Sequence, residues 1–217
     1  MWGNFMIFWI IGIAIIGYAI GCLHGSVVAQ WISGVNLKET GVKNAGASNA
    51  LIVLGKRYGA LVAIIDIGKG ILAVIAVRLL SNQFNLDPEY STLLLFTVGA
   101  AVIFGHNFPF YMKFNGGKGT ATVIGVLFAI DWRFGLAGLV LFIAVALLTD
   151  ILVIGVFMLY VTLMAMAIWL DGYWPILIAA LLFIMAVWKH TENIKRIRAG
   201  TETRIRASFS KKKEKSS

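Results

Sequence analysis

Long apolar stretches alternate with short polar segments along this chain. Most of the apolar stretches reach the length of about 20 residues that a helix needs to cross the hydrocarbon core of a bilayer. Lipid offers the backbone no hydrogen-bond partner, so helices are the form in which such segments cross. We therefore predict an all-α integral membrane protein with helices over residues 5–32, 59–80, 91–111, 120–130, 133–149, 151–170 and 174–188.

The stretch 120–149 can be read as one helix or as two. Asp131 and Arg133 lie in its middle, and charges are costly at the centre of a bilayer. We therefore divide it into 120–130 and 133–149, although the first half is short for a span. The division gives seven transmembrane helices.

The distribution of positive charge indicates the orientation. With seven helices, the basic residues of 33–57, of 105–119 and of the segment from Lys189 onward share one face, opposite Arg78 and Arg133. The positive-inside rule makes that face cytoplasmic, which places the N-terminus outside and the C-terminus in the cytoplasm. Six helices would put the basic C-terminal segment on the wrong side.

Composition supports the membrane assignment. Hydrophobic residues make up 59% of the 217 residues, charged residues 13%, and the mean hydropathy is +0.86. A soluble domain has about 25% charged residues, so this chain lacks the polar surface to cover itself in water. We predict one membrane domain over 1–206 and a basic, disordered tail over 207–217 that contacts anionic lipid headgroups.

The segment "NGGKGTAT" is the polar segment with the most distinctive chemistry. Gly116, Gly117 and Gly119 allow sharp turns that expose backbone N–H groups, and Lys118 adds a full positive charge. A helix that begins at Thr120 would add the positive end of its dipole. The segment therefore suits a phosphate, and equally a tight turn between two helices.

Two further loops would face the same side. In the first, Lys43, Asn44, Gly46, Ser48 and Asn49 offer donors and acceptors at close spacing, although ordinary turns use the same residue types. In the third, His190 and Asn193 stand three residues apart, so a helix would turn both side chains the same way. Three loops with anion-binding chemistry on one face are more informative than any one of them.

Two ionisable residues fall inside the predicted helix 59–80. Asp66 and Lys69 have the i, i+3 spacing of a pair, and intramembrane charges usually face a protein interior or a cavity. Structural pairing and a direct role in a site both remain open. We expect His24 to be interfacial. The three histidines are far apart in sequence and lack a clustered acidic partner, so no metal site is expected.

The chain resembles the bacterial acyl-phosphate:glycerol-3-phosphate acyltransferase family over nearly its whole length, to about Glu202. "GHNFPFYMKFNGGKGTAT" is close to the second motif of that family, and "HTENIKRIRAGTE" is similar to the third. "DIGKG" resembles an element of the second helix. The resemblance implies a bacterial inner-membrane protein with three cytoplasmic motif loops on seven helices. It implies transfer of an acyl group from acyl phosphate to glycerol 3-phosphate, which yields lysophosphatidate and phosphate.

The resemblance also implies roles for residues. Lys118, His190 and Asn193 would be catalytic. No residue is a convincing general base: His106 and His190 are candidates by residue type alone, and the departing phosphate could itself accept the proton of the acceptor. We expect small-molecule substrates and the lipid bilayer as partners, with no cofactor, no metal and no nucleic acid. The residues implied in phosphate or substrate binding are Gly116, Gly117, Gly119, Thr120, His106, Asn107, Lys43, Asn44, Gly46, Ser48, Asn49, Lys69 and Glu202.

The first motif departs from the family pattern. Val42 stands where the family has Ser, and Ile52 where it has Arg. Thr191 replaces an Arg of the third motif, and Asp150 lies in a link that usually carries serines. Charge-assisted hydrogen bonds contribute about 1.5–3 kcal/mol each, so the missing groups matter. Besides the acyltransferase reaction, we consider a paralogue with another acceptor and a non-catalytic carrier of a phosphorylated lipid.

Overall fold

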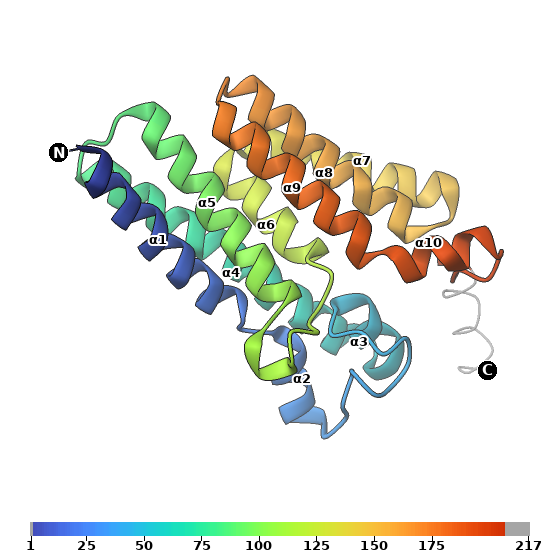
Figure 1. Cartoon of the computed structure of the whole chain (residues 1–217). Helices are drawn as coiled ribbons and strands as arrows, with labels where there is room; N and C mark the ends of the chain where they lie inside the picture. The colour runs from blue at the N-terminus through green and yellow to red at the C-terminus, as the bar shows by residue number, and fades with distance from the viewer. Residues whose placement is uncertain (1, 207–217) are drawn as a thin grey trace.

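The computed structural model describes residues 2–206, and the regular elements of that range are all helical (Figure 1). The N-terminal half holds α1 (Trp2–Gly21), α2 (Gly25–Ser33), α3 (Ala47–Leu54), α4 (Lys56–Gln83) and α5 (Pro88–Asn107). A 3₁₀ turn, η1 (Phe110–Met112), precedes the second half, which holds α6 (Thr120–Ile130), α7 (Trp132–Thr149), α8 (Leu152–Trp169), α9 (Tyr173–Lys189) and α10 (Thr191–Arg198). The proposed tail 207–217 lies outside the described residues.

The predicted division of 120–149 is confirmed. The backbone at Asp131 is extended, with φ −150° and ψ 116°, so α6 ends there and α7 begins. Its carboxylate accepts a hydrogen bond from the Arg133 amide at 2.9 Å and pairs with the Arg133 guanidinium at 2.6 Å. The two charges that would be costly inside one long span cap a helix instead.

The apolar stretch 5–32 contains a break that the sequence pattern did not predict. α1 ends at Gly21 and α2 begins at Gly25, while His24 between them is extended. The break frees backbone carbonyls, and the buried ammonium of Lys69 on α4 takes two of them: Gly21 O at 2.8 Å and Leu23 O at 2.6 Å. A cation from a distant helix therefore stabilises the interruption. The short helix α3 within the first loop was also not predicted.

Length and composition make this a multi-pass membrane protein. Five helical segments of the described chain are long and apolar enough to cross a membrane, or six if α9 and α10, bent by 54° at their junction, form one span. α6 is apolar but shorter. Many large apolar side chains remain exposed on the outer surface of the bundle, as a lipid-facing surface requires; examples are Phe8, Ile64, Leu72, Leu148 and Ile184.

Glycines let neighbouring helices approach closely. A Cβ on Gly21 of α1 would lie 2.3 Å from the Val102 carbonyl oxygen of α5, and one on Gly105 would lie 2.2 Å from the Tyr18 oxygen. Between α4 and α6, a Cβ on Gly125 would lie 2.1 Å from Ile67 O. Small residues at helix contacts are typical of membrane bundles, where close packing supplies the association energy.

One end of the bundle collects the polar segments. Figure 1 shows α2, α3, the loop that precedes α6, and α10 at this end, with the N-terminus at the other. The main hydrophobic core lies beside it and includes Phe96, Val126, Leu159, Tyr160 and Leu182, from α5, α6, α8 and α9. Beneath the first loop, a smaller core of Ala29, Leu37, Ala50 and Val62 packs against α4.

Candidate active site

The three loops meet around one cavity of about 830 Å³. Residues from each of the loops line it, together with the N-terminal parts of α4, α6 and α8. Of the residues expected from the sequence, the walls include Lys43, Asn44, Gly46, Ser48, Asn49, His106, Gly116, Lys118, Gly119, Thr120, His190, Asn193 and Glu202. The convergence that the charge pattern predicted is therefore present in the structure.

The glycine loop holds its shape through backbone contacts with the end of α5. The Gly116 amide donates to Asn107 O at 3.0 Å, and the Gly117 amide donates to His106 O at 3.1 Å. A Cβ on Gly117 would lie 2.1 Å from His106 Nε2. We expected these two amides to bind an anion, but they brace the loop, and their absent side chains leave room for His106.

Amides that are available to an anion lie one step further along the chain. Gly119 has φ +79°, a conformation that favours glycine, and it caps α6 without a side-chain hydrogen bond. Within residues 2–206, the amides of Gly119, Thr120 and Ala121 have no hydrogen-bond acceptor. They lie at the positive end of the α6 dipole on the cavity wall, which is an arrangement that binds phosphate.

Lys118 links the glycine loop to α10. Its ammonium donates to Asn193 Oδ1, and Asn193 Nδ2 donates to Glu202 Oε1 at 2.6 Å. Glu202 also accepts from Arg196 Nε at 2.7 Å, so Lys118, Asn193, Glu202 and Arg196 form one chain of hydrogen bonds. Burial, with the nearby Arg196 charge, lowers the pKa of Lys118 below its usual value.

His190 contributes a histidine to the same cavity wall. The side chain is buried, and its Nδ1 lies 2.8 Å from Ala186 O. Because a carbonyl oxygen only accepts, Nδ1 carries the proton and Nε2 is left as the acceptor of a neutral ring. His190 and Asn193 line the same cavity, as their spacing predicted.

Asn49 organises the first loop. Its side-chain amide donates to Leu37 O at 2.7 Å, Thr40 O at 3.0 Å and Asn44 O at 3.0 Å, and its Oδ1 accepts from the Val42 amide at 2.9 Å. These contacts occupy the polar atoms that sequence reasoning assigned to a substrate. Asn49 therefore shapes the wall that Lys43, Asn44 and Ser48 present to the cavity.

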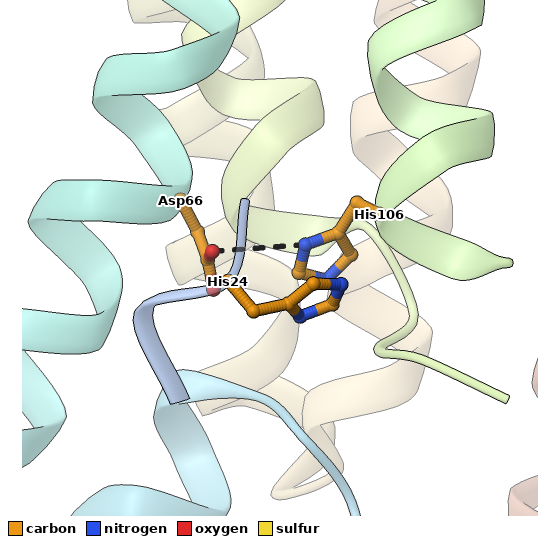
Figure 2. A group of neighbouring side chains, drawn as sticks. All are labelled: His24, Asp66 and His106. Carbon is orange, nitrogen blue, oxygen red and sulfur yellow. Dashed lines mark ion pairs between the residues drawn. The ribbon is translucent and has the colours of Figure 1, made fainter. Parts of the chain in front are cut away.

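A buried cluster of His24, Asp66, Lys69 and His106 adjoins the cavity, whose wall includes Asp66 and His106. Figure 2 shows three of its members, His24, Asp66 and His106. The Asp66 carboxylate is 3.4 Å from Lys69 Nζ and 3.7 Å from His106 Nδ1, and it also accepts from the Gly25 amide at 3.2 Å. Lys69 Nζ is 2.8 Å from His106 Nδ1. Lys69 is absent from the cavity wall, and its contacts are with the α1–α2 break, Asp66 and His106. The structural pairing of Asp66 and Lys69 is therefore present.

Two expectations about histidines are corrected here. His24 is buried, at 3% exposure, and its ring stacks on His106 with centroids 4.4 Å apart. It is therefore not interfacial. The histidines are also not isolated from acids, because one ligand atom from each of His24, Asp66 and His106 lies within 4.8 Å of the others. Packing brings together residues from three segments that the sequence separates.

The cluster does not suit a metal ion. Lys69 Nζ lies against two of the three candidate ligands and so takes the place where a cation would bind. A second positive charge at that distance would be repelled strongly in a medium of low dielectric constant. The other His106 nitrogen faces the Gly117 backbone. The cluster is an internal ion pair that joins α4, α5 and the α1–α2 break.

The glycerol-3-phosphate acyltransferase family model matches residues 11–200. The chain belongs to this family. It is 39% identical over 199 residues to glycerol-3-phosphate acyltransferase 1 of Oceanobacillus iheyensis, covering 92% of this chain and 96% of that one. It is 32% identical over 202 residues to glycerol-3-phosphate acyltransferase of Synechococcus elongatus, with the same two shares.

Two solved structures share the fold. The crystal structure of PlsY, an integral membrane glycerol 3-phosphate acyltransferase, in its glycerol 3-phosphate form matches with a TM-score of 0.78 at 27% identity, over 90% of this chain and 95% of that one. Its lysophosphatidic acid form matches with a TM-score of 0.75 at 28% identity, over 90% and 94% of the two chains. The family resemblance found in the motifs is confirmed.

Of the positions that depart from the family pattern, Val42 and Ile52 line the cavity and Asp150 does not. Val42 and Ile52 line the cavity and are 50% and 51% exposed, so the first-loop wall is apolar where the family pattern has a hydroxyl and a guanidinium. Asp150 is absent from the wall. Its carboxylate accepts a hydrogen bond from the Arg206 amide at 2.9 Å. Asp150 therefore places no negative charge on the cavity wall.

Sequence reasoning left several basic residues of the wall out of the site. Lys38 Nζ donates to Asn115 O at 2.6 Å, which joins the first two loops, and burial lowers the pKa of Lys38. Lys189 Nζ donates to Asn107 O at 3.1 Å and lies 4.8 Å from the centre of the Phe108 ring. Arg196 and Arg204 also line the cavity. Only their positive charge, in segments outside the predicted helices, marked them in the sequence.

Proposed function

We propose that the protein transfers an acyl group from acyl phosphate to the primary hydroxyl of glycerol 3-phosphate, as an enzyme of phospholipid synthesis. The family membership and the cavity with its basic wall carry this proposal. The similar PlsY structures are described with glycerol 3-phosphate and with lysophosphatidic acid, which are the acceptor and the product of such a reaction.

The donor phosphate binds at the start of α6. The Gly119 and Thr120 amides and the Lys118 ammonium surround this position, and all three residues line the cavity. As the bond between acyl carbon and phosphate oxygen breaks, negative charge grows on the phosphate. Fixed N–H groups and an ammonium stabilise that charge without reorganisation. Lys118 is held for this role by Asn193.

The acceptor hydroxyl attacks the acyl carbon from the side of His190. The ester C–O bond forms, the mixed anhydride bond breaks, and the hydroxyl proton passes to the departing phosphate. His190 orients the hydroxyl through Nε2, because Nδ1 is engaged with Ala186 O. His106 does not act as the base, since Lys69 faces its Nδ1 and Gly117 faces its Nε2.

The acyl chain occupies the apolar part of the cavity. Below the basic mouth, the wall consists of aliphatic and aromatic side chains from α4, α6, α7 and α8, namely Ile67, Ile124, Phe142, Val153 and Val156. A charged mouth above an apolar channel matches a phosphate that carries a fatty acyl chain. The apolar wall thus supports an acyl phosphate as the proposed donor.

We further propose seven membrane spans in a single domain over 1–206, with α6 as the short seventh span. The lengths of five or six helices support most of this count, and the basic loops support a cytoplasmic site. The N-terminus is then outside and the C-terminus inside the bacterial inner membrane. An inner-face site meets soluble glycerol 3-phosphate directly.

A paralogue with a different acceptor is the second candidate function. The observation that favours it is the half-exposed Val42 and Ile52 on the cavity wall. An acceptor with an apolar group beside its hydroxyl would bury the Val42 and Ile52 side chains, whereas glycerol 3-phosphate leaves them exposed to water. Screening acceptors against one donor distinguishes the two functions.

The test measures phosphate release from palmitoyl phosphate by the protein purified in detergent, with and without glycerol 3-phosphate. The variant Lys118→Ala is the blank. Lys113→Ala is the matched control, because it removes the same charge from the same loop at a residue outside the cavity wall. Acceptor-dependent release that Lys118→Ala abolishes and Lys113→Ala retains supports the proposal. Absence of release by the folded wild-type protein refutes it.

A further inference from the structure

The chain turns back after α10 and crosses the rim of the cavity. Gly200 has φ +70°, and the Thr201 amide donates to Arg196 O at 2.8 Å, so the backbone reverses at this point. Residues 201–206, which we name the strap, then run toward the link between α7 and α8. Thr203, Arg204 and Ile205 of the strap line the cavity.

The first end of the strap is fastened to α10. Glu202 accepts from Asn193 Nδ2 at 2.6 Å and from Arg196 Nε at 2.7 Å, and its side chain is only 9% exposed. Asn193 in turn holds Lys118. This end of the strap is therefore part of the hydrogen-bond chain that orders the donor phosphate site.

The second end of the strap is fastened to Asp150. This residue has φ +58°, and both of its acceptor groups face the strap. Its carbonyl oxygen accepts from the Ile205 amide at 3.2 Å, and its carboxylate Oδ1 accepts from the Arg206 amide at 2.9 Å. The neighbouring Thr149 carbonyl contacts Arg204 Nη1 at 3.4 Å. Arg204 therefore lies between two fixed points.

We propose that Arg204 binds a phosphate monoester in the cavity and that Asp150 is the positioning residue that holds it there. The proposal rests on the proposed function for the identity of its ligands, which are acyl phosphate and glycerol 3-phosphate. A guanidinium has five N–H donors in a planar fork, so it can contact the Thr149 carbonyl and a phosphate oxygen together.

The fastening explains why an acidic residue is compatible with an anion site. A side chain on a free C-terminal segment would lose much conformational freedom on binding, which lowers affinity. Asp150 removes part of that cost in advance by holding the backbone just after Arg204, while Glu202 holds it on the other side. Its carboxylate is directed at the strap amide and away from the cavity wall. The guanidinium missing at Ile52 is thus supplied from another segment.

The experiment measures the affinity of the purified full-length protein for palmitoyl phosphate and for glycerol 3-phosphate, each alone, by calorimetric titration in detergent. Arg204→Gln should weaken binding of one of them by about tenfold or more, as expected for loss of a charge-assisted contact. The ligand affected tells which phosphate Arg204 holds. Arg206→Gln is the matched control, because it removes the same charge from the same strap and keeps the backbone amide. It should leave both affinities nearly unchanged.

Double variants separate positioning from general stability. Asp150→Ala should lower the affinity for the same ligand in the wild-type background. In the Arg204→Gln background it should lower that affinity no further. Asp150→Asn should keep most of the affinity, since its Oδ1 still accepts from the Arg206 amide. The proposal is overturned if Arg204→Gln binds both ligands as the wild type does. It is also overturned if Asp150→Ala weakens binding equally in both backgrounds.

Wild-type turnover, measured on the same samples, separates this inference from the proposed function. If the wild type turns over and Arg204→Gln binds both ligands with wild-type affinity, the proposed role of Arg204 is refuted and the proposed reaction is retained. If binding depends on Arg204 and Asp150 but the wild type shows no turnover, the proposed reaction is refuted and the proposed role of Arg204 is retained. A wild-type protein that binds neither phosphate refutes both.

Discussion

At the scale of single residues, the site depends on side chains that are present and on side chains that are absent. Lys118 brings a full charge to the start of α6, and its burial lowers its pKa. Gly117 brings no side chain, which leaves room for the His106 ring. Both residues belong to the motif that sequence reasoning singled out, but only the structure shows that Lys118 lines the cavity and that Gly117 lies against a neighbouring histidine.

The lowered pKa of Lys118 predicts a limit on activity at alkaline pH. The charged form binds phosphate, so binding is complete below the Lys118 pKa and weakens as pH rises through it. Because that pKa lies below the usual lysine value, KM for the anionic substrate should rise at a lower pH than for an ordinary lysine. KM measured against pH tests this. Lys118→Arg, whose group stays charged, should move the rise to higher pH. An unchanged profile in Lys118→Arg would assign the titration to another group.

The close approach at Gly117 predicts that even alanine is not tolerated there. A Cβ at 2.1 Å from His106 Nε2 must displace the ring or the loop. We expect Gly117→Ala to cost about 1–3 kcal/mol of stability and to reduce turnover. Gly68→Ala is the control, because a Cβ at Gly68 meets nothing within 4 Å. Thermal unfolding in detergent provides the measurement, and equal unfolding temperatures for both variants would contradict the prediction.

At the scale of elements, the buried cluster joins three helical segments. Lys69 of α4 binds the carbonyls of the α1–α2 break and contacts His106 of α5, while Asp66 accepts from the first amide of α2. Removal of one member leaves an unpaired charge inside the protein, and this is costlier than removal of both.

We therefore expect Lys69→Met alone to destabilise the protein by about 3–5 kcal/mol. The double variant Asp66→Asn with Lys69→Met should recover a large part of that loss, because no charge then remains unpaired. Chemical unfolding of the three proteins in detergent micelles measures the difference. If the double variant were less stable than Lys69→Met, the carboxylate would stabilise the fold through its Gly25 contact rather than through Lys69.

At the scale of the whole molecule, one polar end on an apolar bundle predicts its orientation in the membrane. Single cysteines at Lys43 and Glu192, placed in a Cys22→Ala background, should react with a membrane-impermeant maleimide only after cells are lysed. A cysteine at Glu89 should react in intact cells. These outcomes follow from a cytoplasmic site under the positive-inside rule. The reverse labelling pattern would place the site outside and refute the proposed topology.

The sequence by itself determined the all-helical, multi-pass membrane class, the division at Asp131 and the residues of the three loops. Lipid exposure acts locally, so apolar runs and charges report it directly, and the special chemistry of Gly, Lys, His and Asn is visible in any order. Only the tertiary structure decided which partner each polar group takes. Lys118 and Asn193 are 75 positions apart, and Asp150 and Arg206 are 56 apart. Contacts over such separations depend on how the helices pack, which no local pattern encodes.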